Sequence, residues 1–528
     1  MPPSDLLRVP VVVVGAGPIG VSAAILLAQY GVPCLVLDRF NGVYPQPRAV
    51  HLDDEVYRVL DRLGVAAAFA AISRPTRGLR LVDKHLRVLA EFQRDSTPSR
   101  HGFPQANMFD QPGLEAILRE EMTRHEAVTF RGNVEVTDVR VDDGTGTARV
   151  LFADRGTGTT HAVTADFVLG CDGANSLVRS AIGAHMNDLR FQQRWLVVDV
   201  ETDADLQQWE GVHQVCDATR AATYMRIGDT RYRWEFRLLD GESASDFASV
   251  DELLPLIAPW VTDTPHDRLD LIRVAEYTFR AQLADRWRRG TVFILGDAAH
   301  LTPPFIGQGM GAGIRDAVNL TWKIAGVLAN TLPSDVLDTY QQERRPHIHS
   351  LIRLTLGIGW AMTAGGDLGD LLRRTIVPRL PLVPGLRRRV VDSGTPPLHR
   401  SALILKTLLP GQLAGTLSPN PVVDGHRRLT EVIGNRFAMV TSTPLARRDR
   451  ETLQNRGAVV VHAATGSELA DWLRSGRATA AILRPDMTVM CAGRRPSRLC
   501  RRMPTFHPPV APPQRPATNP EPRKAADA

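Results

Sequence analysis

Cysteine is scarce in this chain, and its pattern excludes two classes of site. The 528 residues contain only five cysteines, which are scattered and never form a CxxC pair: Cys34, Cys171, Cys216, Cys491 and Cys500. Zinc ribbons and thioredoxin-type redox centres both depend on such pairs, so the sequence offers neither. A few unpaired thiols are typical of a reducing compartment, and we expect a cytoplasmic protein that holds no metal.

Aromatic residues are also few, at 6% of the sequence, and basic residues exceed acidic ones only by 63 to 57. No zinc-finger, helix-turn-helix or RNP-like pattern accompanies the basic residues. Nucleic-acid-binding proteins concentrate basic side chains on one module, often with stacking aromatics. We therefore expect no nucleic-acid partner, and we interpret the late arginine clusters as a charged surface.

One apolar stretch, residues 11–28, resembles a signal peptide or a membrane helix in composition. Glycines and Pro18 interrupt it, and the residues before it carry Asp5 as well as Arg8, so no net-positive segment precedes it. Both features argue against a signal peptide and a membrane helix. With 43% hydrophobic and 23% charged residues, the composition is that of a globular protein with a large core and no membrane partner.

The stretch is better explained as the start of a dinucleotide-binding unit. Residues 11–14 are four valines, typical of a strand buried on both faces, and Gly15-Ala16-Gly17-Pro18-Ile19-Gly20 follows at once. An apolar helical segment and a second strand then lead to Asp38. Such a GxGxxG turn lets a pyrophosphate approach the N-terminus of a helix, and the acid accepts hydrogen bonds from a ribose. The motif alone does not distinguish FAD from NAD.

Two further motifs favour the flavin. Residues 171–179, CDGANSLVR, follow a strand-like segment. Residues 292–295 form another buried-strand pattern that leads into GDAAHLTPPFIGQG at 296–309, and a helix is predicted from about residue 314 to residue 328. With these three motifs in this order, the sequence resembles the single-component FAD-dependent aromatic hydroxylases, the family of p-hydroxybenzoate and phenol hydroxylases. The resemblance covers roughly the first 390 residues.

Shorter segments narrow the resemblance. They are similar to the bacterial 3-(3-hydroxyphenyl)propionate/3-hydroxycinnamate hydroxylases, and they comprise residues 47–49, 53–55, 195–199, 233–236 and 339–345. The resemblance implies an α/β fold in which a Rossmann-type FAD-binding domain is interleaved with an α+β substrate domain. A small thioredoxin-like α/β domain, here without CxxC, would follow.

The resemblance also implies roles for individual positions. Gly15, Gly17 and Gly20 would hold the FAD pyrophosphate, and Asp38 the adenosine ribose. The neighbouring Arg39 is also expected to bind the cofactor. Arg48 and Gln111 match positions that contact the phosphate and ribityl region. The later motifs would contribute Asp172, Gly296, Asp297, Pro304, Gly309, Met310 and Gly311. Two positions depart from the family, because many relatives have Glu in place of Asp38 and Asn in place of Gly311.

The expected domain limits follow from the same comparison. The FAD-binding domain would comprise 1–185 and 280–350, the substrate domain 186–279 and 351–395, and the C-terminal domain 401–500. Residues 501–528 contain eight of the 37 prolines and are predicted to form a disordered tail. Within the substrate domain, residues 231–238 alternate charged and apolar side chains, which predicts a half-buried antiparallel strand.

Several prominent residues keep more than one interpretation. His300 could pack within the GDAAH turn or transfer a proton. Arg179 and Arg315 are interpreted as surface or helix-end charges, and Cys171 as a small core residue. An arginine that binds the carboxylate of an acidic substrate is expected but not assigned, and no side chain is assigned as catalytic.

The resemblance implies an FAD-dependent monooxygenase that consumes NADH or NADPH and O₂ and hydroxylates a phenolic acid ortho to its hydroxyl. The expected substrates are 3-(3-hydroxyphenyl)propionate and 3-hydroxycinnamate, in aromatic-acid catabolism, and a homodimer is compatible with the family. One alternative is a hydroxylase of larger polycyclic or antibiotic-like phenols. Others are an NAD-dependent dehydrogenase, which would leave GDAAH unexplained, and a flavin-binding scaffold without turnover.

Overall fold

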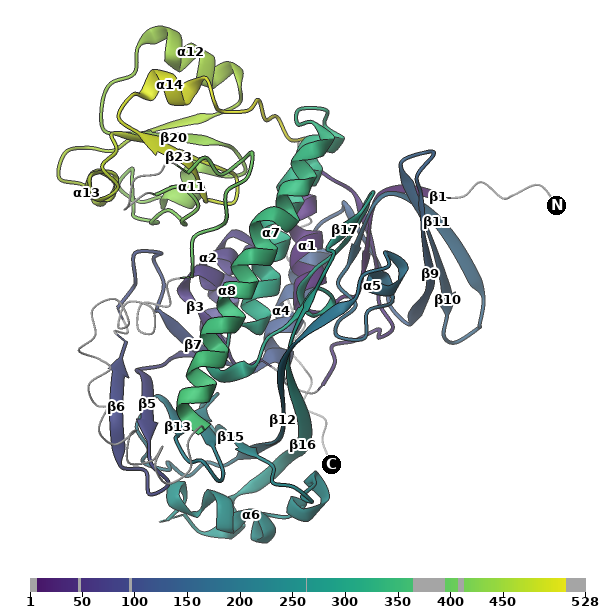
Figure 1. The fold of residues 1–528 in the computed structure, drawn as a ribbon, viewed down its shortest axis with the longest axis vertical. Helices are drawn as coiled ribbons and strands as arrows, with labels where there is room; N and C mark the ends of the chain where they lie inside the picture. Colours follow the sequence, from purple (N-terminus) through teal and green to yellow (C-terminus); the bar gives the residue numbers. More distant parts are fainter. Residues whose placement is uncertain are drawn as a thin grey trace, which may run out of the picture.

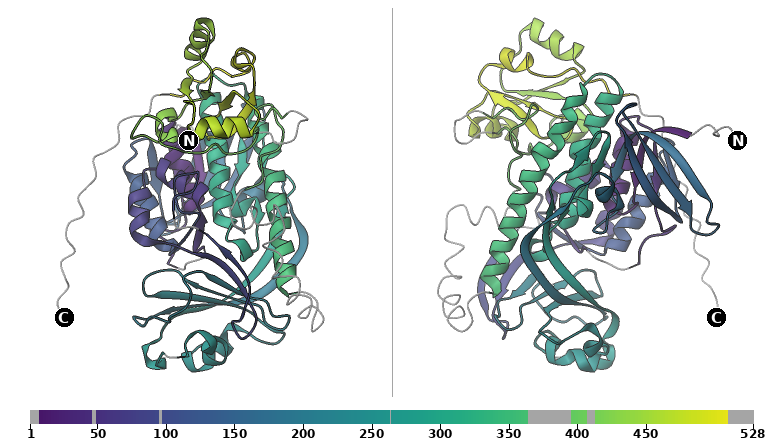
Figure 2. Two further views of the ribbon diagram at one scale, coloured as in Figure 1. Left: turned by 90° about the vertical axis from the view of Figure 1, so that its left-hand side faces the viewer. Right: turned by 45° about the vertical axis from the view of Figure 1, so that its right-hand side comes forward.

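The structure is a computed structural model that describes residues 7–45, 49–94, 97–262, 264–363, 395–406 and 413–509. Figure 1 shows the elements along the long axis of the molecule: the C-terminal domain at one end, the first βαβ unit in the middle and a large sheet at the other end. Long helices run between these parts, and Figure 2 shows the same order from two further directions.

The middle part is built on an eight-stranded sheet with the order β17-β18-β11-β1-β2-β8, extended from β11 by β10 and β9. Strand β1 pairs in parallel with both β2 and β11, and its valines 11–14 are almost fully buried. The strands are β1 (Leu7–Val14), β2 (Cys34–Leu37), β8 (Val128–Arg131), β9 (Val134–Asp142), β10 (Thr147–Asp154), β11 (Thr160–Gly170), β17 (Arg288–Arg289) and β18 (Val292–Ile294). This confirms the predicted βαβ unit.

Helices pack against this sheet and against each other. The apolar helix α1 (Pro18–Gln29) contacts both α7 (Gly309–Leu328) and α4 (Gln111–Thr123). Helix α8 (Asp338–Thr363) follows α7 after a loop, packs against it and extends to the large sheet, as Figures 1 and 2 show. Shorter elements complete this part: β3 (His51–Asp53), α2 (Asp54–Arg62), α3 (Ala66–Ile72), β4 (Ser73–Pro75), β7 (Ala106–Phe109) and α5 (Leu177–Ala181).

The second large sheet has the order β19-β16-β12-β15-β14-β13-β5-β6. Its strands are β5 (Gly78–Val82), β6 (Val88–Gln93), β12 (Met186–Glu201), β13 (Val212–Val215), β14 (Ala222–Arg226), β15 (Arg231–Arg237), β16 (Asp270–Ala284) and β19 (His300–Leu301). One face carries Tyr232, Trp234 and Phe236, which form a separate core with residues of α6 (Val250–Ile257).

The sequence predicted that β15 would be half-buried, and this is wrong. Arg233 and Glu235, on the polar side of the alternation, are 1% and 9% exposed. The alternation identifies two chemically different faces, but it does not show that the polar face lies against other parts of the chain.

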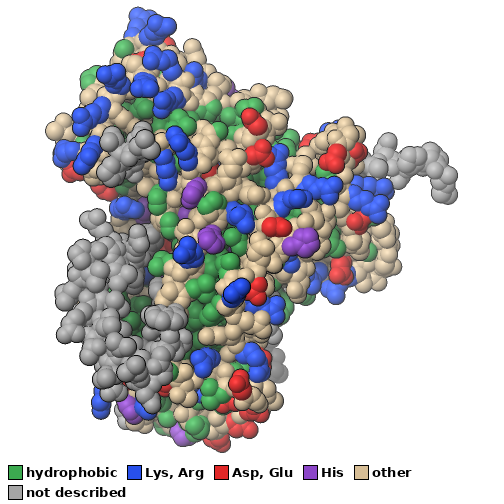
Figure 3. Space-filling model, in the orientation of Figure 1, with side chains coloured by type: hydrophobic (Ala, Val, Ile, Leu, Met, Phe, Trp, Pro, Cys, Tyr) green, Lys and Arg blue, Asp and Glu red, His purple; other side chains and the backbone are tan. Residues whose placement is uncertain are grey.

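The C-terminal domain contains a four-stranded sheet with the order β21-β20-β22-β23, parallel only between β20 and β21. Its elements are α11 (Leu429–Ile433), β20 (Ala438–Thr441), α12 (Arg447–Asn455), β21 (Val459–His462), α13 (Glu468–Ser475), β22 (Ala480–Leu483), β23 (Val489–Gly493) and α14 (Pro496–Cys500). All five cysteines are free. In Figure 3, Lys and Arg side chains gather over this domain. The thioredoxin-like assignment and the domain limits stay predictions.

The predicted disordered tail is wrong for its first part. Met503 and Phe506 are almost fully buried, and the Phe506 ring packs edge-on against Tyr30, Trp322 and Phe437. This segment therefore anchors the end of the C-terminal domain to α1 and α7. The sequence prediction rested on its proline content, which does not indicate whether single apolar residues are buried. Residues 510–528, and residues 364–394 of the predicted substrate domain, lie outside the described residues.

Over the described ranges, no helix is long and apolar enough to cross a membrane. The apolar segment 11–28 is instead split between β1 and α1, both of which lie in the core.

Candidate cofactor and substrate site

The glycine turn after β1 is shaped to bind a large anion. Gly15 has a φ of +100°, and a Cβ there would lie 2.4 Å from the carbonyl oxygen of Cys171. A Cβ at Gly20 would lie 1.9 Å from the Gly15 oxygen, so both positions require glycine. Gly17 differs, because no atom lies within 4 Å of the position of its Cβ. It is the N-cap of α1, where no side chain caps the helix. The free N–H groups and the open space fit a pyrophosphate.

Asp38 lies beside this turn, at the end of β2. Its carboxylate accepts hydrogen bonds from the backbone N–H of Ala16, at 2.5 Å, and of Phe40, at 2.7 Å. These contacts hold the carboxylate at the edge of the glycine turn, with lone pairs left for ribose hydroxyls. The neighbouring Arg39 is exposed and lies over the Phe40 ring. Arg48 lies outside the described residues.

Gln111 and Asp172 both hold backbone segments in place. Gln111, the first residue of α4, accepts a hydrogen bond from the N–H of Ala49 at 2.6 Å, next to the Arg48 position. Asp172 accepts hydrogen bonds from the Ser176 hydroxyl at 2.5 Å and the Val178 N–H at 3.1 Å. Burial raises the pKa of Asp172. The DG motif thus closes the turn that Gly15 touches.

The GDAAH motif is held by a buried ionic cluster. The N–H of Gly296, next to Asp297, donates to Asp316 at 3.1 Å, and His300 Nε2 lies 2.7 Å from the same carboxyl oxygen. Arg344 Nε donates to the other oxygen at 2.8 Å. Burial by itself raises the pKa of Asp316, but Arg344 and His300 outweigh it and lower the pKa. Of the two interpretations of His300, these contacts support packing within the turn.

The segment predicted to surround the flavin ring leads into α7. Residues Pro304–Ile306 form a 3-10 turn, Gly307 is left-handed at φ +62°, and Gly309, Met310 and Gly311 open the helix, again without a side-chain cap. A Cβ at Gly311 would lie 3.0 Å from Val56 and 3.1 Å from an Arg315 nitrogen. The structure thus gives a physical reason for the missing Asn, because other side chains occupy its space.

Arg315 is not the surface charge that the sequence indicated. Its side chain is 11% exposed, and its Nη2 lies 2.7 Å from Asp53 and 2.9 Å from Glu55, both of which are buried. Burial alone lowers the pKa of Arg315, but the two carboxylates outweigh it and raise the pKa. Gln308 Nε2 also donates to Asp53, at 2.9 Å. This cluster joins α2 to the start of α7. Nothing in the sequence indicates it, because Arg315 and its partner Glu55 are 260 residues apart in the chain.

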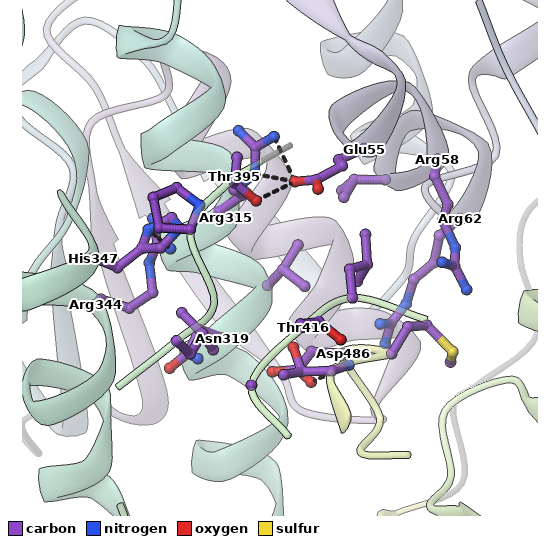
Figure 4. A pocket seen from close by; sticks show the side chains of 18 of the residues that line it. Glu55, Arg58, Arg62, Arg315, Asn319, Arg344, His347, Thr395, Thr416 and Asp486 are labelled. Atoms are coloured by element: carbon purple, nitrogen blue, oxygen red, sulfur yellow. Dashed lines mark hydrogen bonds and ion pairs between the residues drawn. The ribbon is translucent and has the colours of Figure 1, made fainter. Parts of the chain in front are cut away.

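Behind this cluster lies a cavity of about 90 Å³ between α2, α7, α8 and the C-terminal domain, shown in Figure 4. Arg58 lines it and is 3% exposed, and among the described residues it donates only to neutral oxygens, those of Thr430 at 2.7 Å and Ser418 at 2.6 Å. Burial lowers the pKa of Arg58 to about 9. The cavity has room for several water molecules. Its polar wall ties the C-terminal domain to α2.

The polar face of the second large sheet lies against these same segments. Arg231 lies 3.4 Å from Asp110, the residue before Gln111. Gln214 Nε2 on β13 donates to the carbonyl oxygen of Phe305 at 2.7 Å. Met225 on β14 packs with Val50 and Met108. Three adjacent strands therefore contact Asp110, Phe305 and Val50, which are near positions 111, 304 and 48 in the chain, assigned by the sequence to the flavin.

Arg233 lies in the middle of this face and is not available to bind a carboxylate substrate as a free cation. Its guanidinium is bidentate to Asp199, at 2.6 and 2.9 Å, and each side chain is 1% exposed. Sequence analysis missed this pair and its neighbour Glu235. The signal that could have found them is the polar side of the β15 alternation, opposite an aromatic side. No group of three or more metal-ligating side chains occurs among the described residues.

Comparison with known proteins gives a consistent result. The model of the FAD binding domain family matches residues 8–355. A probable NADH-specific resorcinol 4-hydroxylase of Rhodococcus jostii is 37% identical over 355 residues, which is 67% of this chain and 66% of that protein. A 3-(3-hydroxy-phenyl)propionate/3-hydroxycinnamic acid hydroxylase of Burkholderia cenocepacia is 33% identical over 439 residues, 82% of this chain and 79% of that protein.

Two solved structures share the fold. The flavin-dependent monooxygenase PieE, in complex with FAD and substrate, superposes with a TM-score of 0.77 at 20% identity and covers 94% of this chain and 98% of its own. Aklavinone-11 hydroxylase, with FAD and aklavinone, gives a TM-score of 0.76 at 22% identity over 95% of this chain and 99% of its own. At this identity the likeness concerns the fold alone.

Proposed function

The chain belongs to the FAD binding domain family and is an FAD-dependent aromatic hydroxylase, and we propose that its substrate is a single-ring phenol with a polar substituent meta to the hydroxyl. The two relatives described above are named for 3-(3-hydroxyphenyl)propionate and for resorcinol. Both compounds fit this description, since resorcinol carries its second hydroxyl in the meta position. The first remains the leading substrate, and resorcinol is the second candidate because of the more identical relative.

The observation that carries the proposal is the buried polar face of β13, β14 and β15. It lies against Val50, Asp110 and Phe305, so a small polar ligand would be held between that face and the segments proposed to bind the flavin. On its other side the sheet is sealed by the aromatic core under α6. Such a site excludes water and restricts the orientation of a small ring.

The protein's own residues would act mainly by binding. FAD, when bound, supplies the chemistry by which O₂ is activated with electrons from a nicotinamide nucleotide. The N-terminus of α1, with Gly15, Gly17 and Gly20, would hold the pyrophosphate, and Asp38 with Arg39 the ribose. The further contacts that we propose are Arg48, Gln111, Asp172, Gly296, Asp297, Pro304, Gly309, Met310 and Gly311. The start of α7, which has no side-chain cap, would offer its N–H groups and the positive end of the helix dipole to negative charge on the flavin.

NADH is the proposed electron donor, because the relative from Rhodococcus jostii is named as NADH-specific. No second Rossmann domain is needed for it, and Asp38 does not discriminate between NADH and NADPH because it would serve the FAD ribose.

The experiment is NADH oxidation by the purified yellow protein, alone and with each of the two phenols, together with product analysis. Stimulated oxidation with a stoichiometric hydroxylated product identifies the substrate. Stimulation that yields only hydrogen peroxide would mark the phenol as an effector that is not hydroxylated. A yellow protein that neither phenol stimulates would refute the proposal and direct attention to larger phenols.

A further inference from the structure

Two polar side chains on the buried face of the second sheet have no hydrogen-bond partner among the described residues. Glu235 on β15 is 9% exposed, and Thr223 on β14 is 7% exposed. The two residues stand directly opposite each other in the register of the paired strands. Burying a carboxyl group without a hydrogen-bond partner costs free energy. Two such polar side chains beside each other therefore point to a ligand that forms hydrogen bonds with both of them.

Their position relative to the flavin segments is fixed by neighbours on the same face. In the strand next to Thr223, Gln214 is paired with Thr223 and donates to the Phe305 carbonyl, while its own Oε1 is buried with no partner in the described part of the chain. In β15 itself, Arg231 reaches Asp110 at the start of α4. Glu235 and Thr223 therefore lie between the two segments that border the proposed ring site.

We propose that Glu235 is the catalytic residue that accepts the proton of the substrate's phenolic hydroxyl, with the Thr223 hydroxyl hydrogen-bonded to the same substrate oxygen. This inference rests on the proposed function. Hydroxylation converts a phenol, O₂, NADH and a proton into a catechol, water and NAD⁺. As the ring carbon ortho to the hydroxyl gains oxygen, the O–H group becomes acidic, and its proton moves to the Glu235 carboxylate. Glu235 then returns the proton to that oxygen, while the ring C–H proton goes to the oxygen atom that leaves as water, so the ring becomes aromatic again and the carboxylate is regenerated.

The surroundings of Glu235 suit a base. Burial raises its pKa, Arg233 opposes this shift, and Asp199 adds to it. Because Arg233 is bidentate to Asp199, most of its charge is already balanced. Further charged groups near this part of the face are Arg273 on β16, opposite Asp199, and Arg231 with its partner Asp110. A carboxylate with a raised pKa is a stronger base than one in water, and it remains ionised above that pKa.

The test compares Glu235→Gln and Glu235→Asp with a matched control, Glu276→Gln. Glu276 lies in the same sheet, is exposed on β16 and pairs with Arg194. Each protein is first checked for bound FAD by its absorbance and for the dissociation constant of resorcinol by calorimetry. The pH profile of kcat is then measured with whichever of the two phenols the wild type hydroxylates.

We expect Glu235→Gln to keep FAD and to lower kcat by about 100-fold, the usual contribution of a general base. In the wild type kcat falls as the pH drops through the raised pKa of Glu235, and this acid limb disappears in the Gln variant. Glu235→Asp restores part of the rate with a shifted limb, and Glu276→Gln matches the wild type.

A Gln variant with kcat within threefold of the wild type and the same acid limb would overturn the assignment. If that variant does not fold, the Asp variant decides, because an unchanged acid limb in it has the same meaning. These outcomes differ from failure of the proposed function, in which the wild type itself hydroxylates neither phenol.

Discussion

Replacing Glu343 with Gln tests the buried ionic cluster that joins the C-terminal domain to the FAD-binding part. Glu343 lies on α8 with a fully buried side chain. One oxygen accepts hydrogen bonds from Arg484 at 2.9 Å and Ser401 at 2.6 Å. The other accepts them from Asn319 at 2.8 Å and Lys323 at 3.1 Å. The carboxylate therefore has four donors, two of them cations from opposite sides of the junction.

The size of the effect follows from the pKa of Glu343. Burial by itself raises it, but Arg484 and Lys323 outweigh burial and lower it from 4.5 to about 2. A shift of this size corresponds to about 3 kcal/mol of preference for the ionised form in the folded state. Gln cannot balance the two cations, and breaking a buried pair in this way costs about 3–5 kcal/mol. Lys323, whose own pKa burial lowers to about 8, would be the cation most affected.

The assay is urea unfolding of the holoenzyme followed by tryptophan fluorescence. Trp322 is a local probe, because its Nε1 donates to Asp486 at 3.3 Å and Arg484 lies over its ring. As a control, Glu451→Gln removes an exposed pair with Arg447 and should change the unfolding free energy by less than about 0.5 kcal/mol.

The contribution of Glu343 to the unfolding free energy should also depend on pH, in a direction set by its lowered pKa. Because the folded pKa of Glu343 lies below 4.5, its contribution is complete above that pH and is lost as the pH falls toward about 2. The difference between wild type and Glu343→Gln should therefore narrow from neutral pH to about pH 3. A loss smaller than about 1 kcal/mol at neutral pH, or a difference that does not change with pH, would refute the reasoning.

Three further predictions follow from steric contacts. Gly15→Ala places a Cβ 2.4 Å from a carbonyl oxygen and should destabilise even the flavin-free protein, whereas Gly17→Ala, with open space at its Cβ, should leave flavin-free stability unchanged and weaken FAD binding. Thermal unfolding without FAD and flavin titration separate the two, and equal behaviour would contradict the reasoning. Phe506→Ala should lower the free energy of unfolding, measured with urea, by about 3–5 kcal/mol. A loss below about 1 kcal/mol would indicate that this segment is disordered, as the sequence predicted. Gly311→Asn should lower the melting temperature in the wild type, and by less in an Arg315→Ala background, because the two side chains would share one space. An equal loss in both backgrounds would show that Arg315 does not fill that space.

The sequence alone predicted those parts of the molecule that depend on local chemistry. The valine run before Gly15 indicated a fully buried strand, and the glycine spacing after it indicated a close approach between a turn and a helix start. The same holds for the GDAAH turn and for the glycines that open α7. Composition also excluded paired cysteines, because that exclusion needs only counting and spacing.

The burial of individual side chains could not be predicted where it depends on partners far away in the chain. Arg315 looked like a helix-end charge until Asp53 and Glu55 were brought beside it. Phe506 followed a proline-rich pattern typical of disorder, yet it fills a gap between Tyr30 and Trp322.

The sequence by itself indicated a dinucleotide-binding turn, because that turn resides in a short segment with little conformational choice, and the order of its motifs indicated FAD and the fold through resemblance to a known family. Only the tertiary structure decided which polar side chains are paired and which are left facing the ring site. Arg233 and Glu235 are two residues apart on β15, and the sequence pattern places both charged side chains on the same face with nothing to show which of them is paired. Asp199, from another strand, neutralises the first and leaves the second without a hydrogen-bond partner among the described residues, because a pairing free energy exists only where the fold brings two charges together.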